Sequence, residues 1–153
     1  MKAIYDENNV FLGEVKALKG KNNCLPYEPN GKGIIFKRKY GLKVYEGNFK
    51  HGKSCGFGKE YYGFKDVGNT IRYIGEWYED SRTGNGVSYY NNGKKSVVGY
   101  WLDGKVSYKF DTENSEKYKD FQKKLKDKHS KQFYIKYDQF GCIEVVNDLH
   151  IQI

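Results

Sequence analysis

The chain has 153 residues, enough for one domain, and its composition is aromatic and glycine-rich, with 15 Tyr, 9 Phe and 18 Gly. This aromatic content argues against intrinsic disorder, and no stretch approaches the roughly 20 apolar residues of a membrane-spanning helix. The formal net charge of +8 favours anionic partners in general but identifies none of them.

The N-terminus and the cysteines predict an intracellular protein. Asp6 and Glu7 stand where a secretory signal or transit peptide would carry basic residues and an apolar run. Cys24, Cys55 and Cys142 are scattered without Cys-x-x-Cys spacing, so we expect three reduced thiols rather than a disulfide framework or a zinc site. We therefore expect a soluble or peripherally attached protein of the cytoplasm or cytoskeleton, neither secreted nor housed in an organelle lumen.

A repeated pattern dominates residues 31–105. Segments of the form Gly-x-Gly-x-x-aromatic, the first of which spans residues 31–36, alternate with segments of the form x-x-Gly-x-aromatic, which open with Tyr45, Tyr73 and Val97. In a strand, positions i, i+2 and i+4 point to one face, so the opening residue, the glycine and the aromatic of the second form share a face. The repeat positions are Tyr45, Gly47, Phe49, Gly56, Gly58, Tyr61, Tyr73, Gly75, Trp77, Gly84, Gly86, Tyr89, Gly99 and Trp101.

The glycines predict how these strands pack and where they turn. A glycine inside a strand normally weakens it, so a regular one is expected to leave room for an aromatic ring of a neighbouring strand. The remaining glycines, including Asn91-Asn92-Gly93 and Asp103-Gly104, fall where hairpin turns are expected. The sequence therefore predicts a β meander of strands joined by turns.

These residues resemble the MORN repeat, in which Tyr-x-Gly-x-Trp/Phe is followed by spaced glycines and a Gly-x-Gly pair. The segment from Tyr45 to Gly58 fits at every marked position, and the next unit departs once, at Asp80, where glycine is usual. Residues 90–105 are more similar to the bacterial antitoxin-like variant of the repeat. The resemblance implies a mainly β, single-layer, twisted antiparallel sheet over residues 1–110, with clear repeats at 31–105 and a degenerate unit at 11–30.

Residues 111–153 depart from this pattern. Asp111 and Thr112 are helix-capping residues ahead of a basic stretch in which Tyr118, Phe121 and Leu125 have helical spacing. Two strand-like runs follow, at 132–137 and 142–153. We predict a C-terminal α-helix and a β-hairpin that cap the last strand of the array, with an independent binding arm as the alternative.

No segment has a pattern typical of catalysis or of a cofactor site. The Gly-x-Gly pairs lack the third glycine of a dinucleotide-binding motif and lead into aromatic strand patterns instead of a helix. His51 lies close to Cys55 in the sequence, but the cysteine occupies a variable position of the repeat. We therefore predict a non-enzymatic protein without a cofactor, a metal or a small-molecule substrate.

The expected function is that of an interaction or scaffold protein, an accessory or structural subunit of a larger protein assembly. Aromatic residues that adjoin the repeat aromatics should point to the opposite face of the sheet, and exposed rings are enriched at the energetic centres of interfaces. Ordinary cross-strand pairing is the alternative for each ring. The candidate partner-binding residues are Tyr62, Tyr78, Tyr90 and Tyr100.

Anionic lipid and nucleic acid are the two alternatives to a protein partner. Anionic phospholipid headgroups would attract the basic residues at ~1 kcal/mol per cation, although the apolar stripe of the predicted helix is too narrow for insertion. Weak, non-specific nucleic-acid binding is the second alternative, because basic and aromatic residues are interleaved but no nucleic-acid-binding motif is present. The candidate anion or lipid contacts are Lys37, Arg38, Lys39, Lys117, Lys119, Lys123, Lys124, Lys126 and Lys128.

Overall fold

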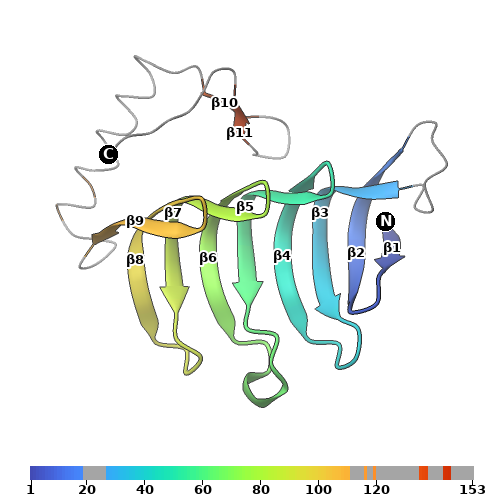
Figure 1. The fold of residues 1–153 in the computed structure, drawn as a ribbon, viewed down its shortest axis with the longest axis horizontal. Helices are drawn as coiled ribbons and strands as arrows, with labels where there is room; N and C mark the ends of the chain where they lie inside the picture. The colour runs from blue at the N-terminus through green and yellow to red at the C-terminus, as the bar shows by residue number, and fades with distance from the viewer. Residues whose placement is uncertain (19–26, 111–115, 117–118, 120–134, 138–142, 146–153) are drawn as a thin grey trace.

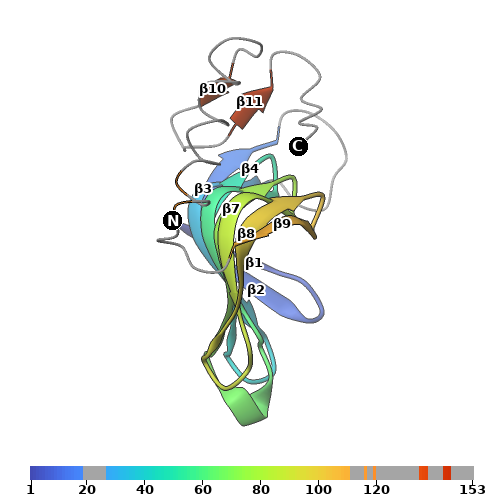
Figure 2. The same cartoon turned by 90° about the vertical axis from the view of Figure 1, so that its left-hand side faces the viewer.

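A computed structural model describes residues 1–18, 27–110, 116, 119, 135–137 and 143–145. Nine strands form one antiparallel sheet in which each strand pairs with the next along the chain, as the meander prediction requires (Figure 1). Seen from the side, these strands form a single curved layer (Figure 2). The strands are β1 (Lys2–Tyr5), β2 (Asn9–Ala17), β3 (Tyr27–Lys37), β4 (Lys43–Lys50), β5 (Lys53–Tyr61), β6 (Ile71–Tyr78), β7 (Ser81–Tyr89), β8 (Lys95–Leu102) and β9 (Lys105–Phe110), with one 3₁₀ turn, η1 (Lys65–Val67), between β5 and β6.

The C-terminal prediction is met in part. Two short strands, β10 (Ile135–Tyr137) and β11 (Ile143–Val145), pair in an antiparallel hairpin within the region predicted to contain one. The predicted helix is not supported, because only Glu116 and Lys119 of its stretch are among the described residues. Whether this region caps the sheet also lies outside the described residues.

A continuous row of glycines crosses the sheet from β2 to β8. Each glycine is the cross-strand partner of the next, so seven neighbouring strands have no side chain at the same height on one face. This register leaves a groove in which aromatic rings lie flat against the backbone. The row consists of Gly13, Gly33, Gly47, Gly58, Gly75, Gly86 and Gly99.

Three rings fill this groove, each lying over its own strand and the next one. A Cβ added to Gly58 would lie 2.5 Å from the Cζ of Tyr45, and one added to Gly86 would lie 2.5 Å from the Cζ of Tyr73. Phe11 covers Gly33 in the same way. The prediction that a repeat glycine makes room for a neighbouring strand's ring holds for Gly33, Gly58 and Gly86; the ring nearest Gly47 or Gly75 belongs to the same strand as the glycine, and Gly99 faces the backbone of Tyr108.

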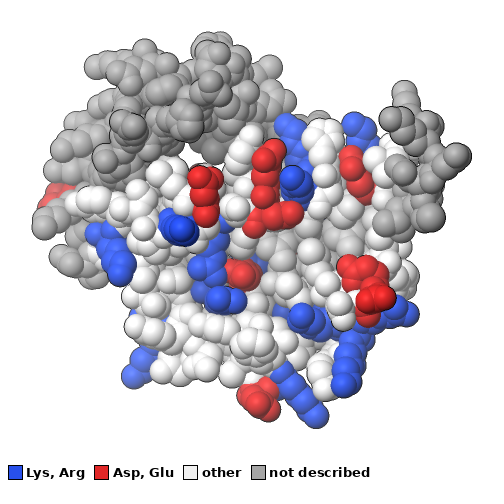
Figure 3. Space-filling model, in the orientation of Figure 1, with Lys and Arg blue, Asp and Glu red and all other residues white. Residues whose placement is uncertain are grey.

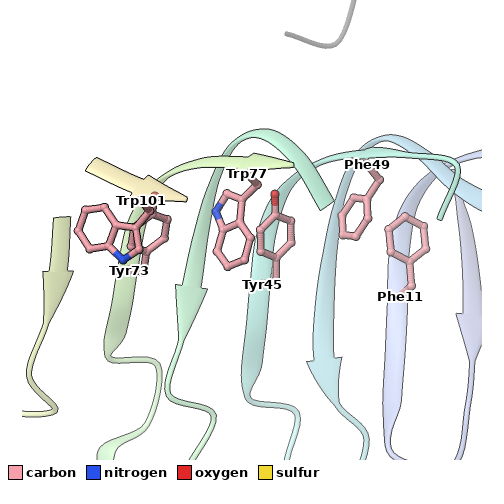
Figure 4. Close-up of a cluster of buried hydrophobic side chains, with 6 residues drawn as sticks. All are labelled: Phe11, Tyr45, Phe49, Tyr73, Trp77 and Trp101. Atoms are coloured by element: carbon pink, nitrogen blue, oxygen red, sulfur yellow. The ribbon is translucent and has the colours of Figure 1, made fainter. Parts of the chain in front are cut away.

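The aromatic residues of the repeat form one ladder of edge-to-face contacts (Figure 4). Neighbouring ring centroids are 5.0 to 5.3 Å apart, within the range in which aromatic pairs attract beyond their area burial. The ladder supplies most of the buried core of a sheet that has no second layer among the described residues. In spatial order its members are Phe11, Phe49, Tyr45, Trp77, Tyr73 and Trp101.

The first glycine of each Gly-x-Gly pair has a different role from the second. Gly31, Gly56 and Gly84 have φ values of +110°, +65° and +76°, and each lies where the register shifts against the preceding strand. Positive φ at such a bulge is a conformation that side chains with a Cβ disfavour. One glycine of each pair is therefore required by the backbone, and the other by the ring above it.

Two carboxylates complete these bulges. The amide of Asn85 donates to Oε2 of Glu76 at 2.7 Å, and the amide of Lys32 donates to Oε1 of Glu14 at 3.0 Å. Burial raises the pKa of Glu76, against the opposing effect of its hydrogen bond from Asn85. Both acids thus satisfy a backbone N–H that the bulge removes from the strand ladder.

At one end of the strands, which we call the tight-turn edge, three connections are two-residue turns. The turns 51–52, 79–80 and 103–104 have positive φ at both residues, which is the type I′ geometry favoured in hairpins. The second amide of each turn donates to a carbonyl of the preceding hairpin: Gly52 to Pro29 at 2.9 Å, Asp80 to Ser54 at 3.1 Å, and Gly104 to Arg82 at 3.0 Å. These bonds tie successive hairpins together.

Asp80 explains the one departure from the repeat pattern. It has a φ of +66°, where the pattern has glycine, and its Oδ1 accepts hydrogen bonds from the amide and the hydroxyl of Ser54 at 2.7 and 3.1 Å. Asp tolerates this backbone region better than most residues. The strain of a non-glycine residue is thus offset by two contacts with the neighbouring hairpin.

Candidate interaction surface

The aromatic rings of the repeat are committed to the fold and are not open to a partner. Tyr73, Phe49 and Trp101 are almost completely buried. The hydroxyls of Tyr45 and Tyr73 donate to the carbonyls of Asn48 and Glu76, at 3.2 and 3.1 Å. Burial raises the pKa of both phenols, so both remain neutral hydrogen-bond donors across the ordinary pH range.

The four predicted partner contacts do not form one patch. Tyr90 is exposed in the turn between β7 and β8, whereas Tyr62 is half-buried and its hydroxyl donates to the carbonyl of Tyr89 at 2.5 Å. Tyr78 is half-buried at the tight-turn end of β6. Tyr100 alternates with Trp101 and so lies on the opposite face, as expected, but only 4 % of its surface is exposed.

Four exposed rings instead lie at the other end of the strands, the edge opposite the tight turns. Tyr5, Tyr40, Phe64 and Tyr90 are 50–62 % exposed, and they lie in or beside the four longer connections 6–8, 38–42, 62–70 and 90–94. These connections follow one another along the lower edge of the sheet in Figure 1. Three of the four rings were not singled out from the sequence, where the available signal is an aromatic residue among turn-forming Gly, Asn and Asp.

Basic side chains lie between these rings. Arg38 and Lys39 of the predicted lipid-contact set are exposed in the second of these connections, and Lys37 beside them is half-buried. Lys65 and Arg72 are exposed in and after the third connection. The helix lysines of the same predicted set lie outside the described residues, with the exception of the exposed Lys119; these are Lys117, Lys123, Lys124, Lys126 and Lys128.

The basic groups lie within 6 Å of tyrosine ring centroids. The ammonium groups of Lys39 and Lys65 lie 5.2 and 5.4 Å from the ring centroid of Tyr40, on either side of it in the sequence. The guanidinium of Arg38 is 5.9 Å from the ring of Tyr5, a distance at which cation–π attraction still acts. We call this surface the aromatic–basic rim; it consists of Tyr5, Arg38, Lys39, Tyr40, Phe64, Lys65, Arg72 and Tyr90.

The rim carries an excess of positive charge. Across residues 5–9, 37–43, 61–72 and 89–95 there are eight Lys or Arg against three Asp or Glu. In Figure 3 basic side chains outnumber acidic ones along the lower margin of the molecule. Amides of Asn8 and Asn9 donate to the carboxylate of Asp6, and these bonds hold the pKa of Asp6 below its usual value.

The residues considered for catalysis have other roles in the structure. His51 occupies a tight turn, and its Nδ1 lies 3.3 Å from Oε1 of Glu28. Cys55 is buried and disulfide-bonded, so the expectation of three reduced thiols is wrong for this residue; Cys24 and Cys142 lie outside the described residues. Sequence spacing could not show this, because a disulfide depends on separation in space.

No group of three or more His, Cys, Asp or Glu side chains among the described residues could hold a metal ion. No helix within the same residues has the length and apolarity needed to cross a bilayer.

Comparison with known proteins identifies no family. No protein-family model matches the chain, and no curated protein matches it. The function is therefore argued from the geometry of the sheet and its rim.

Proposed function

We propose that this chain is a non-enzymatic interaction or scaffold protein, an intracellular accessory subunit whose MORN-type hairpins hold a protein partner. The observation that carries the proposal is the separation of two sets of aromatic residues. The repeat rings are buried in the ladder, while four rings outside the repeat positions stay exposed at one edge, where Arg38 and Lys39 lie near tyrosine rings and form no ion pair with a described residue. Exposed Tyr and Arg at a single edge are typical of interface centres.

The fold supports this role by holding the rim on a rigid frame. The two-residue turns fix the hairpins at one edge through amide-to-carbonyl bonds, and the six rings of the ladder link β2, β4, β6 and β8 across the sheet. Loops positioned by such a scaffold are where proteins commonly carry their binding residues. The long connections therefore present their rings and cations in a fixed order along the edge.

The test is affinity purification of the protein from the cells that produce it, with cross-linking to locate the contact. We expect a stoichiometric co-purifying protein whose cross-links map to residues 38–43, 62–70 or 90–94. A variant with a weakened ladder, Trp77→Ala, should lose the partner under conditions in which its sheet unfolds. Recovery of the protein as a monomer without a stoichiometric partner would contradict the proposal.

Anionic lipid remains the competing proposal because Arg38 and Lys39 are exposed beside aromatic rings. It is tested by flotation with liposomes of neutral or anionic headgroups. Binding to anionic liposomes at physiological salt would favour it, and the absence of binding even at low salt would remove it.

A further inference from the structure

We propose that the aromatic–basic rim is a docking site for an extended, acidic peptide segment of a protein partner. This inference rests on the proposed function and names the chemistry of the partner. Three features of the rim carry it: the physical continuity of its contacts, the absence of carboxylate partners for its cations, and the regular spacing of the loops that form it.

The contacts of the rim run through adjacent connections. Tyr40 lies between Lys39 of its own turn and Lys65 of the next connection. In this next connection the ring centroids of Phe64 and Tyr62 are 6.3 Å apart, and the guanidinium of Arg72 lies 5.6 Å from the ring centroid of Tyr62. The third and fourth connections are joined by the bond from the hydroxyl of Tyr62 to the carbonyl at residue 89.

At its other end the rim reaches the first hairpin. The amide of Arg38 donates to the carbonyl of Asn8 at 2.8 Å, and its guanidinium donates to the backbone carbonyl of Asp6 at 3.1 Å. The guanidinium also lies near the ring of Tyr5. All four long connections thus belong to one surface rather than to four independent loops.

Among the described residues, the cations of the rim contact aromatic rings or a backbone carbonyl, and, beyond the hydrogen bonds from the amides of Asn8 and Asn9, the charge of Arg38 helps to lower the pKa of Asp6. Within the described residues, Arg38, Lys39, Lys65 and Arg72 form no ion pair. Two cations outside the rim set do form ion pairs: the ammonium of Lys43, at the same end of the sheet, lies 3.0 Å from the carboxylate of Glu46, and Arg82 is paired with Glu60. An incoming carboxylate could therefore bind the rim cations without displacing an acid that the protein already provides.

The composition of the rim favours a peptide over a membrane or a nucleic acid. Three of its four rings are tyrosines, and Phe64 is its single exposed ring without a hydroxyl, which is little apolar area for insertion into a bilayer. Asp6, Glu7 and Asp66 are exposed on the same edge and would repel a continuous phosphate backbone. Separate carboxylates on a peptide can contact the cations and avoid these three acids.

The spacing of the connections indicates an extended segment. Successive rim connections are two strands apart, which at about 4.8 Å per strand gives a spacing of about 9.6 Å. A polyproline II segment repeats every three residues, over about 9.3 Å. The rim cations lie in or beside the second and third connections, so acidic residues three positions apart could reach both connections, and aromatic surfaces are a known means of binding such segments.

The probe is a fluorescein-labelled 15-residue peptide made of five Glu-Glu-Pro units, with Gln-Gln-Pro and Lys-Lys-Pro peptides as controls. Binding is measured by fluorescence anisotropy at physiological salt. The test variant carries Arg38→Gln, Lys39→Gln, Lys65→Gln and Arg72→Gln. The matched control carries Lys16→Gln, Lys32→Gln, Lys53→Gln and Lys105→Gln, which are exposed lysines nearer the tight-turn edge, so both variants change the net charge by the same amount.

We expect saturable binding of the Glu-Glu-Pro peptide by the unmodified chain, a loss of affinity of about tenfold or more in the rim variant, and a change within about twofold in the matched control. Tyr40→Ala with Phe64→Ala should weaken binding by about tenfold, whereas Phe57→Ala, at an exposed ring on the sheet face, should not. Circular dichroism checks the fold of each variant. Should the fourfold variant not fold, Lys39→Gln with Lys65→Gln replaces it.

Several outcomes would overturn the inference. Equal loss of affinity in the rim variant and the matched control would mean that only net charge matters. Tighter binding to a 20-nucleotide poly-dT strand or to phosphatidylserine vesicles than to the peptide would assign the rim to another class of partner. A partner recovered equally by the unmodified chain and the rim variant would refute the rim but leave the proposed function standing, whereas recovery of no partner by either would refute the proposed function.

Discussion

Replacement of Trp77 by alanine tests whether the ring ladder supports the sheet. The indole packs edge-to-face against Tyr45 at 5.2 Å and Tyr73 at 5.3 Å, and its Nε1–H donates to the carbonyl of Gly58 at 3.2 Å. Each aromatic pair contributes roughly 0.5–1.5 kcal/mol beyond area burial, and the hydrogen bond about 0.5–1.5 kcal/mol. Because truncation of a buried Trp costs about 3–5 kcal/mol, we expect a loss of about 4 kcal/mol.

The assay is urea unfolding followed by the fluorescence of the remaining Trp101 and by circular dichroism. Trp77→Phe keeps a ring but removes the N–H donor, so it should lose less, about 1–2 kcal/mol. Phe57→Ala is the surface control, since this ring is 57 % exposed, and it should stay within ~0.5 kcal/mol of the unmodified protein. A Trp77→Ala variant as stable as the Phe57→Ala variant would refute the ladder as the source of stability.

The remaining predictions concern glycine, the tight turns and a buried acid. Gly75→Ala should destabilise the protein by about 2 kcal/mol or more, because its Cβ would lie 2.6 Å from the Asn85 carbonyl oxygen. Gly93→Ala should cost about 1 kcal/mol in the same urea assay, because Gly93 has a φ of +86° but no atom close to the added Cβ. Asp80→Ala should lower the free energy of unfolding by about 1–3 kcal/mol, because it removes the acceptor of two hydrogen bonds from Ser54. Asp80→Asn should lower it less, because the amide oxygen can still accept a bond, and equal losses in the two variants would contradict the role of the Ser54 bonds. Burial raises the pKa of Glu76, so its ionised form disfavours folding at pH values above the unfolded pKa of about 4.3 and has no such effect below it. Glu76→Gln should therefore become progressively more favourable to stability as the pH of the unfolding assay rises from about 4 to about 8, and a pH-independent difference would argue against burial of the charge.

The faces of the central strands could be predicted from sequence because they follow directly from strand periodicity. Tyr45, Gly47 and Phe49 were placed on one face by their spacing of two, and the structure buries both rings on that face. The turns at Asp103 and Gly104 were also correctly located, because Asp-Gly tolerates positive φ at both positions. These features depend on residues that are close in the sequence.

The two roles of glycine could not be distinguished in this way. Gly56 and Gly58 look alike in the Gly-x-Gly pattern, but the first sits at a bulge with φ +65° and the second lies under Tyr45. The distinction requires the register between neighbouring strands. Alternate connections of a meander share one end of the sheet, but which of their side chains come together depends on the conformation of each loop, so Tyr40 and Phe64, which are 24 positions apart, were not recognised as members of one surface.

The opposite face of the sheet shows a second limit of the pattern. Alternation correctly places Tyr100 on the face away from the ladder, but alternation alone says nothing about what covers that face, and the ring is buried. Tyr90 was selected by the same rule and is exposed because it follows the end of β7 and belongs to a turn. Adjacency to a repeat aromatic therefore gives the direction of a side chain within a strand but does not give its exposure.

The two edges of the sheet divide stability from recognition. At the tight-turn edge, amide-to-carbonyl bonds link each hairpin to the one before it, and nothing in that arrangement requires an exposed ring. At the other edge the connections vary in length, so they can carry insertions without altering the register of the glycine row. Since Asp80 acts through the first edge and Lys39 through the second, we expect Asp80→Ala to lower stability with little effect on peptide affinity, and Lys39→Gln to do the reverse. A substitution at either edge that changed both measurements together would show that binding depends on the stability of the whole sheet.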